Sequence, residues 1–266
     1  MTTPTAGDPF RTDEPFRVEL TVAAPAESVW RALRDKQQIR RWHGWEFDGL
    51  DAEIDEIFFT DVVESEHERR IVVNGGDTFD VVDVGDTSII RMTRAPRDPA
   101  NDWDQWYDDI NEGWITFLHQ LRFALERHPG EARRTVYLDG TLGASADPIN
   151  ALGLQDVAAG PVGAPYAIEL AGEQVSGDVL FSSAHQAGFT VAQWGDGIVI
   201  VGVVGSAPHH PEGGVMAVLT TYGLPDERLA ELEDRWTTWW RSRYPAAESS
   251  DAAEAAHPAP EAQPVQ

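Results

Sequence analysis

The chain has 266 residues, 42% of them hydrophobic, and it carries a formal net charge of −25 with no Cys. This length can bury one large core or two ordinary ones, and the lack of Cys excludes disulfides, thiolate metal sites and cysteine nucleophiles. Both halves of the sequence are net negative. Neither half therefore offers the basic surface that nucleic acid or an anionic membrane requires.

The sequence shows no signal for export or membrane insertion. Residues 1–15 are polar and lack the apolar core of a signal peptide, and no apolar run reaches the length of a membrane span. Residues 246–266 are rich in Ala, Pro and Glu without apolar periodicity, so both ends are predicted to be disordered tails. The sequence predicts a cytoplasmic protein, and its preference for Arg over Lys is typical of bacteria with GC-rich genomes.

The ordered region begins with alternating apolar and polar residues at 16–22, which predict a β-strand. The stretch AAPAESVWRAL follows, with Pro25 near a helix start and with Trp30 and Leu33 spaced for one buried face. A second, short helix is predicted to end near Trp42. Four further strands, joined by turns, are predicted at 53–63, 67–73, 78–84 and 87–93.

A long helix is predicted to close the first half. Its apolar residues recur at helical spacing along one stripe, formed by Ile110, Trp114, Phe117, Leu118, Leu121 and Leu125. Acidic residues crowd its amino end, where the helix dipole stabilises negative charge. His119 is predicted to lie beside the stripe, at the surface or at the boundary of the core.

The second half repeats this order in a degraded form. TLGASADPINALGL at 141–154 aligns with TVAAPAESVWRAL at 21–33, and RWTTWWRSR aligns with GWITFLHQL so that Trp236 corresponds to Trp114. Pro148 inside the second motif predicts that its first helix is a single turn. Two matches with nearly equal offsets indicate a duplication rather than a chance alignment, which is the alternative. Further alternating runs lie near 177–184, 188–194, 197–205 and 214–222.

One pattern in the first half resembles the START/polyketide-cyclase (SRPBCC) superfamily. The pattern is AP-x-E-x-VW-x-AL, a short helix ending in Trp, a strand meander and then GW-x-x-x-L-x-x-L. Its residues are Ala24, Pro25, Glu27, Val29, Trp30, Leu33, Trp42, Gly113, Trp114, Leu118 and Leu121. It looks most like the branch related to the C-terminal domain of the activator of the ninety-kilodalton heat-shock ATPase. The resemblance covers 16–128 closely and 134–244 loosely.

This resemblance implies an α+β fold made of two tandem helix-grip (START-like) domains. Each domain is expected to be a curved antiparallel sheet around a long C-terminal helix, the first at 16–130 and the second, degenerate one at 131–245. The resemblance also implies a cavity between sheet and helix, which relatives use for sterols, polyketides, hormones and other apolar ligands.

The expected ligand site lies in the first domain. Its residues are Trp42, His43, Trp45, Phe47, Phe59, Phe79, Met92, Trp114, Phe117, Leu118 and Leu121. These side chains either line an apolar pocket with a few polar groups or fill the core by packing against one another. Strand alternation does not distinguish Phe58 from Phe59, because both faces of that segment are apolar. In the second half, the rings of Trp236, Trp239 and Trp240 are expected to fill the corresponding groove.

No catalytic or metal-binding constellation stands out. His43 either caps a helix end or lies at the pocket rim, and neither it nor His119 has an identifiable orienting carboxylate. His209 and His210, with Glu212 nearby, offer at most three ligands in one loop and fit a solvated loop better than a metal site. We therefore expect no catalytic residue, no metal and no cofactor.

Three functions remain open. The leading one is non-enzymatic binding of a small hydrophobic molecule in the first domain. The second is a co-chaperone-like protein-interaction module, suggested by the branch that the sequence resembles. The third is an enzyme of the aromatase or cyclase kind, which needs an acid or base inside the cavity. The expected partners are thus a small apolar ligand or another protein, and neither nucleic acid nor a membrane.

Overall fold

The computed structural model describes residues 15–73, 75–96, 107–205 and 211–246. The tails predicted at 1–15 and 246–266 lie outside these ranges, apart from residues 15 and 246. Within the described ranges, no helix is both long enough and apolar enough to cross a membrane.

The first half forms one five-stranded antiparallel sheet with the strand order β1-β5-β4-β3-β2. Its first strand therefore pairs with its last strand, and the others follow in reverse order. The elements are β1 (Arg17–Val22), α1 (Ala26–Arg34), α2 (Lys36–Ile39), α3 (Leu50–Phe59), β2 (Val63–Ser65), β3 (Arg70–Val73), β4 (Asp77–Asp83), β5 (Ser88–Thr93) and α4 (Tyr107–Arg127).

The second half forms a six-stranded antiparallel sheet built on the same plan, with the order β6-β11-β10-β9-β8-β7. Its elements are β6 (Arg133–Thr141), α5 (Pro148–Ala151), α6 (Gln155–Ala158), β7 (Pro165–Leu170), β8 (Glu173–Ser182), β9 (Gln186–Val191), η2 (Ala192–Trp194), β10 (Gly197–Val204), β11 (Gly214–Tyr222) and α7 (Asp226–Arg241). In both halves short helices follow the first strand and a long helix follows the last. The predicted fold of two tandem helix-grip domains is confirmed.

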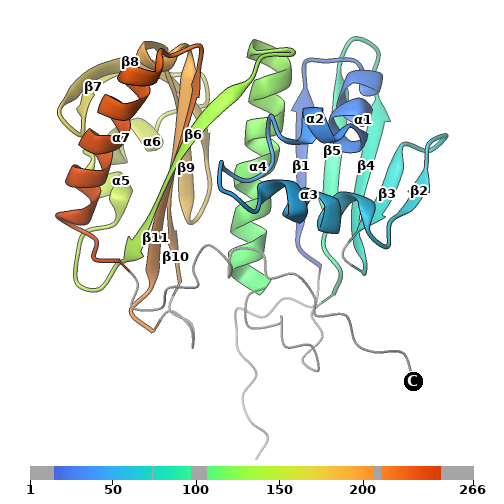
Figure 1. Ribbon diagram of the computed structural model, residues 1–266, viewed down its shortest axis with the longest axis horizontal. Helices are drawn as coiled ribbons and strands as arrows, with labels where there is room; N and C mark the ends of the chain where they lie inside the picture. The colour runs from blue at the N-terminus through green and yellow to red at the C-terminus, as the bar shows by residue number, and fades with distance from the viewer. Residues whose placement is uncertain (1–14, 74, 97–106, 206–210, 247–266) are drawn as a thin grey trace, which may run out of the picture.

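Helix α4 lies between the two sheets, and α7 lies on the far side of the second sheet (Figure 1). One face of α4 carries Trp114 and Leu118 into the core of the first domain. Its opposite face places Phe123 against Ile198 and Ile200 of β10. The second sheet is therefore covered on both faces, which explains why all six residues of β9 are buried.

The two final helices present equivalent Trp residues to their own sheets. Trp114 and Trp236 are both fully buried, each in the core of its domain. The α7 stripe consists of Leu229, Leu232, Trp236 and Trp240, which recur at helical spacing on a single face. The single-turn helix predicted around Pro148 is also confirmed, because α5 has four residues.

One predicted strand is wrong. Residues 53–63 form most of α3 and its link to β2 rather than a strand. The buried residues of α3 are Leu50, Ile54, Ile57 and Phe58, and this spacing places them on one side of a helix. In addition, β7 has no counterpart among the predicted strands, although it pairs with β8 over its whole length.

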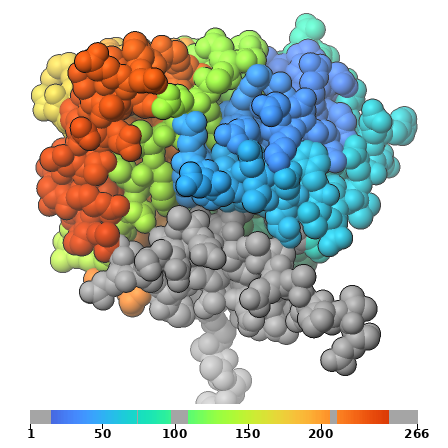
Figure 2. All heavy atoms as spheres, in the orientation of Figure 1, coloured from blue at the N-terminus to red at the C-terminus, as the bar shows by residue number. Residues whose placement is uncertain are grey.

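The two halves contact each other directly at the surface as well as through α4. On the face shown in Figure 2, atoms of the first half (blue) lie against atoms of β6 (green). In this region the backbone N–H of Glu46 donates to Oγ1 of Thr135 at 2.6 Å, and the backbone N–H of Thr135 donates to Oε2 of Glu46 at 3.0 Å. This reciprocal pair joins the loop after α2 to the first strand of the second domain.

Candidate functional site

Most of the predicted ligand-binding residues converge in the core of the first domain. Eight of them are buried there: Trp42, His43, Phe79, Met92, Trp114, Phe117, Leu118 and Leu121. Trp45 and Phe47 are partly buried and pack against the same core. The structure thus brings together ten of the eleven predicted residues, with Phe59 as the exception.

Phe59 does not face this core. It is 40% exposed, whereas its neighbour Phe58 is fully buried. The segment is helical, so adjacent residues point about 100° apart rather than to opposite faces of a strand. Phe59 instead lies under the guanidinium of Arg34, whose Cζ is 5.2 Å from the ring centroid.

The interior of the first domain is filled by its own side chains. The Trp114 ring lies edge-on to Phe79 at a centroid distance of 5.1 Å and to Phe117 at 6.0 Å. A hollow of about 10 Å³ lies beside Trp42 and Leu121, which is about the space of one water molecule. Of the two outcomes expected for these rings, the structure shows mutual packing. Their role in binding a ligand stays a prediction.

A buried polar pair lies inside this apolar cluster. His43 is fully buried, and its Nε2 lies 2.8 Å from Oε1 of Glu53 on α3. The imidazole is enclosed by rings at centroid distances of 4.9 Å from Phe117 and 5.2 Å from Phe58. The carboxylate partner of His43 was not identifiable in the sequence because Glu53 falls in the segment predicted as a strand.

Arg133 holds the loop that carries His43. This side chain enters from the first residue of β6, is 5% exposed, and donates hydrogen bonds to acceptors of the first domain. The acceptors are the main-chain oxygens of Arg40, Trp42, His43 and Gly44 and the Oε1 of Gln120. Burial lowers the pKa of Arg133 to about 10. A charge from the second domain therefore fixes the backbone of the first.

His119 is not at the surface, contrary to the sequence prediction. It is 7% exposed because the second sheet covers the back of α4. Its ring stacks on Phe181 of β8 with centroids 3.7 Å apart and planes 6° apart. Burial, followed by the nearby charge of Arg122, lowers the pKa of His119 to about 3. The neutral imidazole therefore serves as an aromatic contact between the domains.

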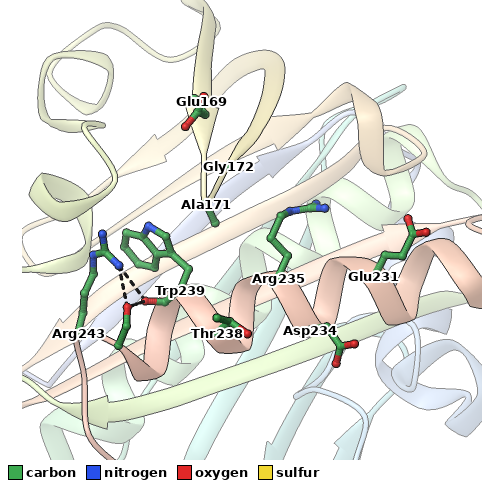
Figure 3. Close-up of a pocket in the computed structure, with 10 residues that line it drawn as sticks. Glu169, Ala171, Gly172, Glu231, Asp234, Arg235, Thr238, Trp239 and Arg243 are labelled. Atoms are coloured by element: carbon green, nitrogen blue, oxygen red, sulfur yellow. Dashed lines mark hydrogen bonds between the residues drawn. The ribbon is translucent and has the colours of Figure 1, made fainter.

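A groove of about 860 Å³ lies in the second domain, between α7 and the β7–β8 turn (Figure 3). Strand β7 contributes Glu169, the turn contributes Ala171, and α7 contributes Asp234, Thr238 and Trp239. The sequence predicts that an open cavity between sheet and helix, if there is one, lies in the first half. The groove lies beside Trp239 and not beneath Trp236 and Trp240, so this stays a prediction. Trp236 and Trp240 do fill the core as predicted, but Trp239 is only partly buried and lines the groove.

Several charged groups of the groove are already held in place. Arg235 forms a close ion pair with Glu173 of β8, and Glu231 pairs with Arg228 at 2.6 Å. The Arg235–Glu173 pair connects α7 to the strand that follows the turn. This partly buried pair fixes one side of the groove, whereas the Glu231–Arg228 pair is exposed to solvent.

No metal centre is found in the part of the chain that the structure describes. Within residues 15–73, 75–96, 107–205 and 211–246, no three His, Asp or Glu side chains converge at ligand distances. His209 and His210 lie outside the described residues, as do His257 and most of the acidic stretch that precedes α4.

The sequence matches no protein-family model and no curated protein. The chain is similar in structure to DynU16, a protein in the dynemicin biosynthetic locus, at 17% identity over 92% of this chain and 100% of that chain, with a TM-score of 0.31. It is similar to the di-domain ARO/CYC BexL from the BE-7585A biosynthetic pathway, at 15% identity over 94% of this chain and 99% of that chain, with a TM-score of 0.33. It is also similar to the Aha1 dimer from Colwellia psychrerythraea, at 17% identity over 44% of this chain and 98% of that chain, with a TM-score of 0.32. Because these TM-scores are low, the tandem fold is assigned from this chain's own strand order.

Proposed function

We propose that this chain is a non-enzymatic binding protein that holds a small, ring-containing molecule in the groove between α7 and the β7–β8 turn. The observation that supports this proposal is the contrast between the two domains. The groove measures about 860 Å³, within the range of small-molecule sites, whereas the hollow in the first domain measures about 10 Å³. The partly buried indole of Trp239 supplies an aromatic surface for the ligand.

Binding is favoured over catalysis by the placement of the acid–base groups. An aromatase- or cyclase-type enzyme needs an acid or base that reaches its substrate. The His43–Glu53 pair has suitable chemistry, but aromatic rings enclose the imidazole. In the groove, Arg235 and Glu231 are already engaged in ion pairs. These groups are suited to orienting a ligand rather than to exchanging protons with it.

A second candidate keeps the ligand inside the first domain, as the sequence predicts. The observation that favours it is the His43–Glu53 pair within an apolar lining, since small-molecule sites combine many apolar side chains with a few placed polar groups. A ligand there must displace rings such as Phe117 from one another. The two candidates therefore predict different effects of substitutions in the two domains.

The experiment titrates fatty acids, sterols and aromatic polyketides by calorimetry, with native mass spectrometry of the mixtures. The proteins are the wild type, Trp239→Leu, Phe117→Leu and the control Phe59→Leu, which removes a 40% exposed ring that lines neither the groove nor the core of the first domain. The proposal expects saturable binding that Trp239→Leu weakens by about threefold or more, because a stacked aromatic contact is lost. Phe117→Leu and Phe59→Leu should leave it unchanged.

The other outcomes separate the alternatives. If Phe117→Leu changes binding while Trp239→Leu does not, the ligand lies in the first domain. If no compound binds the wild type, the small-molecule function is refuted and a protein partner becomes the better explanation. A compound that emerges chemically changed would identify an enzyme.

A further inference from the structure

Arg243 occupies the ring face of the groove's aromatic residue. Its guanidinium Cζ lies 4.1 Å from the centroid of the Trp239 ring. Its Nη1 also donates to the main-chain oxygen of Trp239 at 3.1 Å and to Oγ of Ser242 at 2.9 Å (Figure 3). Arg243 is exposed and forms no ion pair with any described residue. The indole therefore already accommodates a planar cation that neighbouring carboxylates do not hold.

The remaining charge of the groove is negative. Glu169 and Asp234 line it, are exposed, and form no ion pair within the described ranges. Arg235, by contrast, is engaged with Glu173. The whole chain carries a net charge of −25, and such a field favours the approach of cations and disfavours anions. Charge and ring chemistry thus point to the same kind of ligand.

We infer that the groove binds a small planar cation, such as an amidinium or guanidinium attached to a ring, which replaces the Arg243 guanidinium over Trp239. This inference rests on the proposed function and names the ligand class of that site. The cation is attracted to the ring face of the indole, as Lys and Arg side chains are. The carboxylate of Glu169 on β7 supplies the counter-charge, and Arg243 acts as a built-in competitor.

Three probes of nearly equal shape test which ligand charge the groove prefers. Benzamidine is cationic, benzamide is neutral and benzoate is anionic at pH 7. Each is titrated into isotopically labelled full-length protein, and the dissociation constant is taken from the shifts of the Trp indole N–H signals. We expect benzamidine to bind at least about threefold more tightly than benzamide, on the scale of an exposed cation–π contact, and benzoate to bind most weakly. Added salt should weaken benzamidine selectively.

Two variants of the groove distinguish a competing Arg243 from one that merely contacts the ligand. Arg243→Gln should tighten benzamidine binding by about twofold to fivefold, because it frees the Trp239 ring face. Glu169→Gln should weaken it by about twofold to fivefold, the range expected for an exposed charge pair. Glu233→Gln is the matched control, since it removes the same charge from an exposed α7 residue that does not line the groove, and it should leave binding unchanged.

The inference is overturned if benzoate or benzamide binds the groove as tightly as benzamidine, or if Arg243→Gln weakens benzamidine. In either case the proposed binding function stands with a different ligand class. If neither these probes nor any compound of the apolar panel binds the wild type, the proposed function fails together with the inference.

Discussion

Replacing Arg133 by Met should destabilise the whole chain strongly. Met has a similar length and no donor, so four main-chain oxygens in the loop from Arg40 to Gly44 lose the guanidinium that binds them. The Oε1 of Gln120 also loses this donor, but it keeps the hydroxyl of Thr220 at 2.9 Å. The loop that carries His43 would then lose its buried connection to β6 and keep the exposed Glu46–Thr135 hydrogen bonds.

The magnitude follows from the burial of these groups. Each buried acceptor left without a donor costs about 1–3 kcal/mol. The main-chain oxygen of Gly44 keeps Nε2 of Gln120 as a donor at 3.2 Å, so the upper limit is set by three oxygens, those of Arg40, Trp42 and His43. Relief from burying the charge, which is seen in the lowered pKa of Arg133, offsets part of the cost. The net loss should be about 3–5 kcal/mol, the range seen when one partner of a buried charged pair is removed. This is a large fraction of the stability of an ordinary domain.

The assay is urea unfolding of the full chain, followed by Trp fluorescence and circular dichroism. Arg134→Met is the matched control. Arg134 is the next residue, but its side chain is 48% exposed and it pairs with Asp226 at 2.9 Å and Glu46 at 3.5 Å. Its loss should cost no more than about 1 kcal/mol. An equal effect of the two substitutions would refute the view that Arg133 connects the domains.

Two further predictions concern acid stability and one turn. The pKa of His119 is about 3 in the folded protein against an ordinary value of 6.5, so the unfolded chain binds the proton more readily and stability should fall as pH drops from 6.5 towards 3. His119→Phe keeps an aromatic ring stacked on Phe181 and should reduce the loss of stability at low pH, measured by urea unfolding at several pH values. If the variant shows the same pH profile as the wild type, His119 does not cause this loss. Gly195→Ala should cost at least about 3 kcal/mol by thermal and urea unfolding, because φ is +70° and the new Cβ would meet the oxygen of Tyr222 at 1.7 Å. Gly85→Ala, with φ +86° and open space around the new Cβ, should show only the backbone cost of about 1–2 kcal/mol, and equal losses would disprove the clash.

The order of the elements was predictable from the sequence because both halves carry strong periodic signals. The α4 stripe of Trp114, Phe117, Leu118 and Leu121 is buried as its spacing indicates, and the alignment of Trp114 with Trp236 identifies the duplication. The periodicity of the α3 segment was ambiguous between a strand and a helix. A strand there would carry apolar residues on both of its faces. Including Leu50 with Ile54, Ile57 and Phe58 reveals the helical spacing. That helix brings Glu53 to His43.

The contact between the domains could not be predicted from the Trp114 stripe of α4 alone. His119 lies opposite the Trp114 stripe and is buried only because the second sheet packs there. A weak signal does exist, since Ile115 and Phe123 also lie on that side and make α4 apolar on two faces. A helix with two apolar faces is typical of an internal layer. Arg133 gave no signal, because four of its five acceptors are main-chain oxygens that any residue provides.

The groove lies on the flank of α7 that corresponds to a covered flank of α4. Aligning Trp236 with Trp114 places Asp234 and Thr238 of α7 where α4 has Glu112 and Thr116. On α4 these two residues meet the second sheet, because Oγ1 of Thr116 donates to Oε1 of Gln186 at 2.7 Å and Nε2 of Gln186 donates to Oε2 of Glu112 at 2.6 Å. The flank that joins α4 to the second sheet is thus exposed on α7 within the described residues, where it forms one wall of the groove.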